Sequence, residues 1–175
     1  MSQLPNSSSC HAGWLGVVSA EHVARGVSLD IAQVHHGKRA GLARMRAGDW
    51  LVYYSPHRRL SERSPVQAFT AIGRIADDEI WQADEGDFRP WRRRVNYRTD
   101  ARWVPVTELR DVLDLTAAPN WGYQLRRGLI PLNEPDVQRL HLAMTGSAAP
   151  SAPVGPGVAP TTDRAAGPAR EPALW

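Results

Sequence analysis

The chain has 175 residues, of which 42% are hydrophobic, and its formal net charge is +3. This size and apolar content are enough for one ordinary domain with its own core. The chain has no apolar run long enough to span a membrane and no signal peptide, so we expect a cytoplasmic protein. The only cysteine, Cys10, excludes an internal disulfide and a multi-cysteine zinc site.

The two ends of the chain differ in composition from its middle. Residues 147–175 contain six prolines, eight alanines and three glycines, with almost no large apolar side chain before Leu174. Such a segment gains too little burial to offset the entropy of ordering. We therefore predict a flexible leader at 1–13, a folded domain at 14–146 and a disordered tail at 147–175.

The first half of the folded part begins with a β-rich segment, WLGVVS, which predicts a strand over 14–19. A helical pattern follows over 20–27, with Ser19 as the expected N-cap. Residues 38–45 predict a second helix, and DWLVYYS predicts a strand over 49–55.

The second half predicts further strands over 66–75, 79–84, 88–97 and 102–106, and helices over 107–115 and 134–144. Asp77 and Asp78 predict a tight turn that would join two of these strands in an antiparallel hairpin. Asn133 is a good N-cap for the last helix. Six short strands with helices between them indicate an α+β fold with a mainly antiparallel sheet, closed or nearly closed.

Arginines gather in pairs and triplets, and lysine is almost absent. Clusters lie at Arg58 and Arg59, at Arg92, Arg93 and Arg94, and at 126–127. Guanidinium groups match phosphate oxygens, so these clusters could hold nucleic acid, although on charge alone a solvated surface is the simpler interpretation. Lys38 is the single lysine against 20 arginines, which indicates a need for a compact ammonium at this position.

Three polar segments are candidates for a binding pocket. Gln33, His36 and Lys38 can donate to or accept from a base edge, and Gly37 permits a close approach of the backbone. Residues 54–56 end a strand where a barrel would open, and residues 120–123 combine an amide with an indole. Each segment can also be read as structural: a polar loop that covers strand ends, or a turn.

The seven tryptophans admit two interpretations, core packing or a few indoles lining a cage for a base. No paired metal-ligand motif accompanies His35 and His36, so we expect no metal and no cofactor. No nucleophile elbow, phosphate-binding loop or dinucleotide fingerprint is present. We therefore expect a binding protein and not an enzyme.

A series of motifs in order resembles the EVE domain in its compact bacterial stand-alone form. The motifs are WLGVVS at 14–19, QVHHGK at 33–38, GD at 48–49, YYSP at 53–56, QAFTAIG at 67–73, FRPWRR at 88–93 and NWGY at 120–123. The resemblance spans roughly residues 14–144. It implies a PUA-like, mainly antiparallel β-barrel with short flanking helices.

The resemblance also implies a function, the reading of a modified base in DNA or RNA in an aromatic-walled pocket. The matching positions, our predicted base-pocket residues, are Ser19, His22, Gln33, His36, Gly37, Lys38, Tyr54, Ser55, Pro56, Asn120 and Trp121. The phosphate-binding residues predicted beside them are Arg58, Arg59, Arg92, Arg93 and Arg94.

Three hypotheses about function follow from these residues. In the first, a flipped base enters the pocket, the arginines hold flanking phosphates, and an effector protein on another chain supplies the response. In the second, the same pocket takes a free nucleoside or another small molecule without polymer contacts. In the third, Lys38 or His36 acts as a catalytic acid or base.

Overall fold

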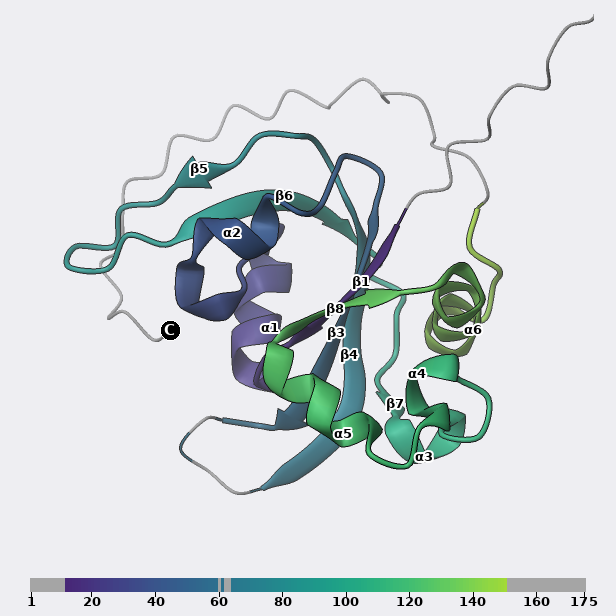
Figure 1. Cartoon of the computed structure of the whole chain (residues 1–175). Helices are drawn as coiled ribbons and strands as arrows, with labels where there is room; N and C mark the ends of the chain where they lie inside the picture. The colour runs from purple at the N-terminus through teal and green to yellow at the C-terminus, as the bar shows by residue number, and fades with distance from the viewer. Residues whose placement is uncertain (1–11, 60, 62–63, 151–175) are drawn as a thin grey trace, which may run out of the picture.

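The computed structural model describes residues 12–59, 61 and 64–150 (Figure 1). Its strands are β1 (Gly13–Val17), β2 (Ile31–Ala32), β3 (Trp50–His57), β4 (Pro65–Ile75), β5 (Trp81–Gln82), β6 (Trp91–Tyr97), β7 (Val104–Pro105) and β8 (Leu129–Leu132). Its helices are α1 (Ala20–Ser28), α2 (Arg39–Leu42), α3 (Val106–Leu109), α4 (Asp114–Ala117), α5 (Trp121–Gln124) and α6 (Glu134–Thr145), with short 3₁₀ turns η1 (His35–Gly37) and η2 (Leu125–Arg127).

The strands form one curled, mixed sheet with the order β2-β6-β4-β3-β1-β8, while β5 pairs with β6 and β7 pairs with β4. The pair β1 and β3 is parallel, and the other pairs are antiparallel. A parallel pair needs a crossover connection, and α1 lies within it. The sheet curls into a half-barrel, which confirms the predicted α+β fold with a mainly antiparallel sheet (Figure 1).

Helices cover both faces of the sheet, with α1 and α2 on one side and α3, α4 and α6 on the other (Figure 1). Side chains along β3 alternate between these sides, as strand geometry requires. Trp50, Val52 and Tyr54 join the core cluster that contains residues of α6, whereas Leu51 and Tyr53 join the cluster that contains residues of α1 and α2. A strand with both faces covered explains the continuous apolar run at 50–54.

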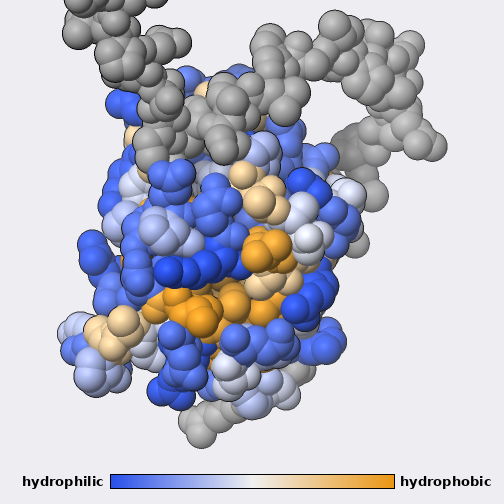
Figure 2. Space-filling model, turned by 90° about the vertical axis from the view of Figure 1, so that its right-hand side faces the viewer, coloured by the Kyte–Doolittle hydropathy of each residue, from blue (hydrophilic) through white to orange (hydrophobic). Residues whose placement is uncertain are grey.

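The α6 side of the molecule carries apolar surface. Figure 2 shows this side, where an apolar band crosses a mostly hydrophilic face. Leu142 on α6 and Val112 between α3 and α4 are exposed.

Two of the predicted local structures are wrong. The hairpin around Asp77 and Asp78 does not form, because the two residues of β5 pair with β6 and not with β4. The predicted helix at 107–115 is split into α3 and α4 by Leu113, whose backbone is extended and whose side chain is buried. Burial of this leucine outweighs the local helical preference.

The ends of the folded unit also differ from the predicted boundaries at 14 and 146. Gly13 is the first residue of β1, and the Ala12 N–H donates to Asp49 Oδ1 at 3.1 Å. At the other end Ala149 is buried, and the Pro150 carbonyl accepts a hydrogen bond from Arg74 at 2.7 Å. The rest of the predicted leader and tail, 1–11 and 151–175, lies outside the described residues.

The two predicted helix caps have different outcomes. Asn133 caps α6, since its side chain accepts from the Asp136 N–H at 2.8 Å. Ser19 occupies the N-cap position of α1, but its side chain makes no capping hydrogen bond. The Ser19 hydroxyl is therefore left for another partner. Across the described ranges, no helix combines the length and the apolar character needed to cross a membrane.

Candidate functional site

A cavity of about 490 Å³ lies where the end of β1, the start of α1, segment 33–40 and the turn into β8 come together. Pockets for small ligands commonly measure about 300–1,000 Å³. The cavity is lined by Val17, Val18, Ser19, His22, Gln33, Val34, His35, His36, Lys38, Ala40, Arg126 and Gly128. Segments that are far apart in the sequence thus meet at one place.

The wall formed by η1 has an unusual backbone. His35, His36 and Gly37 have φ values of 50°, 55° and 79°, all in the left-handed region. Side chains rarely adopt this region, and such strain gathers at functional sites. At Gly37 a Cβ atom would lie 2.6 Å from Pro90 Cβ, so only glycine fits there.

His35 links this wall to the opposite one. Its Nε2 is 2.8 Å from the Arg127 carbonyl oxygen, which joins η1 to the turn before β8. Its ring lies against Gly41 and Gly128, where an added Cβ would come within 2.7 and 2.9 Å of ring atoms. The His35 imidazole therefore connects the two walls of the cavity, η1 and the turn before β8.

Two buried tyrosine side chains hold the backbone of the segment that leads into η1. Tyr53 Oη donates to the Gln33 carbonyl at 3.3 Å, and Tyr97 Oη donates to the Ile31 carbonyl at 2.9 Å. Burial raises the pKa of Tyr53 to about 12 and that of Tyr97 well above its ordinary value. Both groups stay protonated and act as donors, which holds the segment from Ile31 to Gln33 in place.

Two buried polar groups that line the cavity have no hydrogen-bond partner among the described residues. They are the Ser19 hydroxyl and the Gln33 side-chain Nε2, and both residues are 4% exposed. An unpaired buried donor costs about 1–3 kcal/mol. Groups of this kind beside a cavity are available to pair with a ligand or with ordered water.

The mouth of the cavity is basic. Lys38 and Arg126 line it and are exposed, and no aspartate or glutamate is among the lining residues. The Arg126 guanidinium lies 5.2 Å from the centre of the Tyr123 ring. Arg39 and Arg127, next to these residues in the chain, are also exposed. The site therefore favours an electron-rich or anionic ligand.

The structure brings five of the predicted pocket residues together and places six elsewhere. Those that line the cavity are Ser19, His22, Gln33, His36 and Lys38. Those outside the lining are Gly37, Tyr54, Ser55, Pro56, Asn120 and Trp121. Segment 33–38 and the start of α1 therefore carry the site.

The residues outside the lining have structural surroundings instead. Ser55 is buried and shares a hydrogen bond of 2.8 Å with Thr70. Tyr54 packs edge-on against Phe69 and Trp121, at 5.6 and 6.2 Å between ring centres, and burial raises its pKa. Asn120 is exposed at the start of α5.

The predicted aromatic wall is not part of this cavity, since no tryptophan, tyrosine or phenylalanine is among its lining residues. Residues such as Trp14 and Tyr53 point into the cores because they lie on strands with both faces covered. The flat rings at the cavity are imidazoles, from His22, His35 and His36. The sequence interpretation missed His35 and Arg126, although both lie in segments it had singled out.

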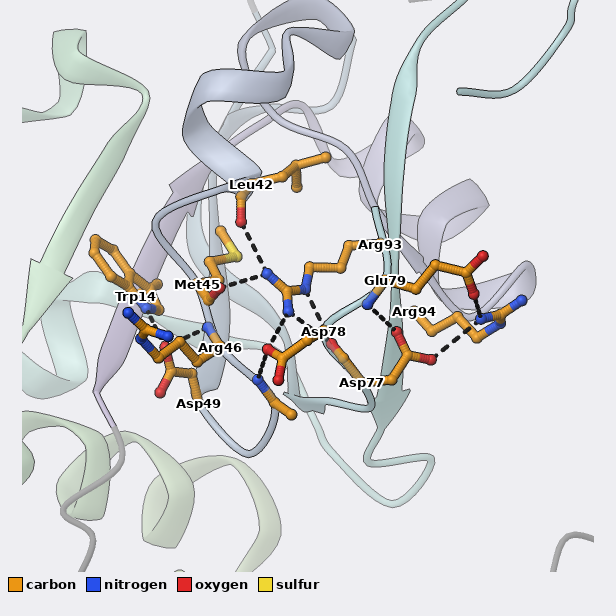
Figure 3. Close-up of polar contacts among 11 residues, drawn as sticks. Trp14, Leu42, Met45, Arg46, Asp49, Asp77, Asp78, Glu79, Arg93 and Arg94 are labelled. Atoms are coloured by element: carbon orange, nitrogen blue, oxygen red, sulfur yellow. Dashed lines mark hydrogen bonds and ion pairs between the residues drawn. The ribbon is translucent and has the colours of Figure 1, made fainter. Parts of the chain in front are cut away.

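The prediction that Arg93 binds phosphate is wrong, because this side chain is inside the protein. Figure 3 shows its guanidinium between the end of α2 and the turn at 77–79. It is 2% exposed and donates to the Leu42 carbonyl at 3.0 Å, the Met45 carbonyl, the Asp77 carbonyl at 2.7 Å and Asp78 Oδ1 at 2.7 Å. Its donors are engaged with the protein, and it joins α2 to the sheet.

Arg92 and Arg94, which flank Arg93 on β6, have different surroundings. Arg92 is buried, donating from Nε to Gln33 Oε1 at 3.1 Å and from Nη2 to Glu85 at 2.6 Å, so its predicted phosphate role is also wrong. Arg94 is half exposed, pairs with Asp77 and Glu79, and lies 5.0 Å from the Trp81 ring centre. Three successive arginines of β6 thus have three different environments.

Arg58 and Arg59 lie beside the start of α1. The Glu21 N–H donates to the Arg58 carbonyl at 3.0 Å, and Arg59 pairs with the Glu21 carboxylate at 3.1 Å. Both side chains are exposed. Because Glu21 neighbours His22 of the cavity lining, these arginines are near the α1 end of the cavity, and their predicted phosphate role stays a prediction. Within the described ranges, no group of three His, Cys, Asp or Glu side chains could hold a metal ion.

Comparisons with known proteins find similarities in structure and in sequence. Solved structures with a similar arrangement include Rpa0253 from Rhodopseudomonas palustris and a hypothetical protein from Leishmania major. The first is 18% identical, with a TM-score of 0.49 over 77% of this chain and 93% of that one. The second is 13% identical, with a TM-score of 0.48 over 76% and 94%.

Sequence relatives are closer. A UPF0310 protein of Renibacterium salmoninarum is 49% identical over 78% of this chain and 97% of its own length. A UPF0310 protein of Mycobacterium avium is 41% identical over 77% and 98%. The family model for the EVE domain matches residues 12–142. The chain therefore belongs to the EVE domain family, a PUA-like family that generally binds nucleic acid.

Proposed function

We propose that this chain is a reader that takes a flipped, modified nucleobase of DNA or RNA into the cavity beside α1. One observation carries the proposal: the Ser19 hydroxyl and the Gln33 amide nitrogen are buried, unpartnered among the described residues, and line a cavity with a basic mouth. Buried hydrogen-bonding groups recognise a base edge, and cations at the mouth attract the phosphates that flank it.

The energies are of the right order for this task. Extruding a base costs a few kcal/mol, and stacking on a flat ring returns about 1–3 kcal/mol. In this cavity the flat rings are imidazoles, so hydrogen bonds to Ser19 and Gln33 and contacts of Lys38 and Arg126 with phosphates would supply the rest. The valines at 17, 18 and 34 add apolar surface suited to a methyl or similar substituent.

The proposal is binding without turnover. A hydroxyl and a carboxamide, the two groups left unpaired at the cavity, form hydrogen bonds but do not ionise near neutral pH, so they are poor general acids or bases. An effector on another chain would then couple recognition to a response. A product that accumulates beyond one equivalent per protein would overturn this part of the proposal.

The experiment is a binding titration with the full chain. Matched oligonucleotides carry 5-methylcytosine, 5-hydroxymethylcytosine, N6-methyladenine or the unmodified base at one position, each at two salt concentrations, with the free nucleosides alongside. Tighter binding to one modified strand, weakened by salt, is the expected result. Equal binding to all strands would leave only a general basic surface, and salt-independent binding of the free nucleoside would favour a small-molecule site.

A further inference from the structure

The side-chain amide of Gln33 has its orientation set by its neighbour. Arg92 Nε lies 3.1 Å from Gln33 Oε1, and a guanidinium only donates hydrogen bonds. The carbonyl end of the amide must therefore face Arg92, and the NH₂ end faces away from it. Nε2 is buried, has no partner among the described residues, and belongs to a side chain that lines the cavity.

Arg92 is itself held in position. Its Nη2 lies 2.6 Å from Glu85 Oε1, and the same carboxylate oxygen is 2.6 Å from Arg25 Nη2 of α1. The Arg92 and Glu85 side chains are 10% and 15% exposed, so water competes little for this pair. Rotating the Gln33 amide would place NH₂ against the guanidinium, donor against donor, and lose the Arg92 hydrogen bond.

The surrounding groups also offer donors. Lys38 and Arg126 are cations that only donate, and the cavity lies at the start of α1, where the helix dipole favours negative partial charge. The Ser19 hydroxyl, unpartnered and 4% exposed, can donate as well. A ligand that satisfies these groups must present acceptors.

We infer that Arg92 and Glu85 are positioning residues that make Gln33 a fixed donor, and that the bound base presents a ring carbonyl oxygen to it. This inference rests on the proposed function. A carbonyl oxygen has two lone pairs and can accept from two donors at once, whereas a ring nitrogen has one. Bases of the cytosine, uracil and guanine classes carry such an oxygen, and bases of the adenine class carry none. The cavity therefore selects oxo-bases over adenine and its N6-modified forms.

The first part of the test compares ligands on the full chain. Oligonucleotides of one sequence carry 5-methylcytosine, 5-hydroxymethylcytosine or N6-methyladenine at a single position. The expected result is tighter binding to a cytosine derivative than to N6-methyladenine. Preferential binding to the adenine derivative would overturn this inference and leave the proposed function standing, while no preference for any modified strand would overturn both.

The second part exchanges the donor for an acceptor. In Gln33→Glu, the carboxylate still accepts from Arg92 but presents only oxygen to the cavity. Affinity for the cytosine derivative should fall about tenfold to a hundredfold, with a smaller fall for N6-methyladenine, whose exocyclic N–H can donate to the carboxylate. An equal loss for both ligands would contradict the assignment of Gln33 as a donor.

The third part separates positioning from folding. In Arg92→Met the amide is free to turn, so the ratio of the two affinities should fall about tenfold. Arg92→Lys, which restores a donor, should recover part of that ratio. A purely structural role for Arg92 would lower both affinities together and leave their ratio unchanged. Arg94→Met, on the same strand with its side chain outside the cavity, should leave the ratio at the wild-type value.

Discussion

Two regions of this protein are rich in hydrogen-bond donors, and they use them in opposite ways. On β6 the Arg93 guanidinium is surrounded by carbonyl oxygens and a carboxylate of its own chain. At the cavity, the Ser19 hydroxyl and the Gln33 amide nitrogen have no partner among the described residues. The densest cluster of positive charge in the sequence is thus largely internal, and the two buried groups left without a partner at the cavity are neutral.

The comparison teaches which feature indicates a binding site. A run of arginines indicates a binding site only if its hydrogen-bond donors are not already paired. Arg92 and Arg93 are buried and donate to groups of their own chain. A buried hydroxyl or amide without a partner beside a cavity carries a cost that a ligand can remove. The predictions below test this contrast between matched and unmatched donors.

The largest effect is expected for Arg93→Met. The variant leaves the carbonyls of Leu42, Met45 and Asp77 without their donor, and removing one partner of a buried charged network typically costs about 3–5 kcal/mol. Chemical denaturation should show a loss of this size in the free energy of unfolding. Arg94→Met is the matched control, because its ion pairs are exposed and worth under about 1 kcal/mol. Similar losses in the two variants would remove the distinction drawn between these neighbours.

Gly128→Ala should have the next largest effect, and it tests whether His35 holds the two cavity walls together. Gly128 has φ 69°, and an added Cβ would lie 2.9 Å from the His35 ring. We expect a loss of about 1–3 kcal/mol in unfolding free energy and weaker binding of the modified strand. Gly122→Ala, in open space on α5, should be neutral or slightly stabilising. If Gly128→Ala melts and binds like the wild type, the wall geometry does not depend on this contact.

Lys38→Ala and Arg126→Ala test the basic mouth. Each exposed cation that contacts a phosphate contributes about 0.9 to the slope of log affinity against log salt concentration. We expect each variant to flatten that slope by about this amount, with unchanged stability, because neither residue is part of a core. The control is Arg110→Ala, an exposed arginine after α3 on the other side of the sheet (Figure 1). If only Arg110→Ala changed the salt dependence of affinity, the phosphate contacts would lie on the α3 side of the sheet and not at the cavity mouth.

Much of the fold could be predicted from the sequence, because β3 and β4 are long, apolar and bounded by turn residues. The short strands β2 and β8 could not, since two to four residues carry no clear period. The split between α3 and α4 depends on burial of Leu113, which is a tertiary effect. Local pattern therefore predicted the strands that form the middle of the sheet and missed those at its edges.

The candidate site was predicted in part for a similar reason. Segment 33–38 stood out because His, Gly and Lys occur together there, and the structure brings most of it to the cavity. Arg126 was noted only as a charge, because the turn that carries it to the cavity depends on long-range pairing of β8 with β1. The sequence also could not predict which of the arginines at 92–94 form hydrogen bonds inside the protein. Their partners lie 7 to 59 residues away in the chain.

The smallest predicted effect concerns another of the unmatched atoms, Nε2 of His141, which is buried in a packed core and lines no described cavity. Its Nδ1 donates to the Ser147 carbonyl at 2.7 Å, and its ring packs edge-on against Trp50. Burial lowers the pKa of His141; Arg98 and Arg74 lower it further, while Ser147 and Asp100 oppose the shift.

Because the neutral form is favoured in the folded state, the unfolded chain binds the extra proton first as pH falls below its own pKa of about 6.5. Stability of the wild type should therefore decrease from about pH 7.5 to about pH 5.5, as the unfolded state gains that proton. His141→Asn keeps an N–H for Ser147 but does not titrate, so its stability should change less across the same range. Denaturation curves at both pH values measure this difference, and the remaining histidines, common to both proteins, cancel in the comparison. Equal slopes would mean that His141 takes up its proton as easily in the folded state, and that an unpartnered buried atom without a cavity carries no penalty here.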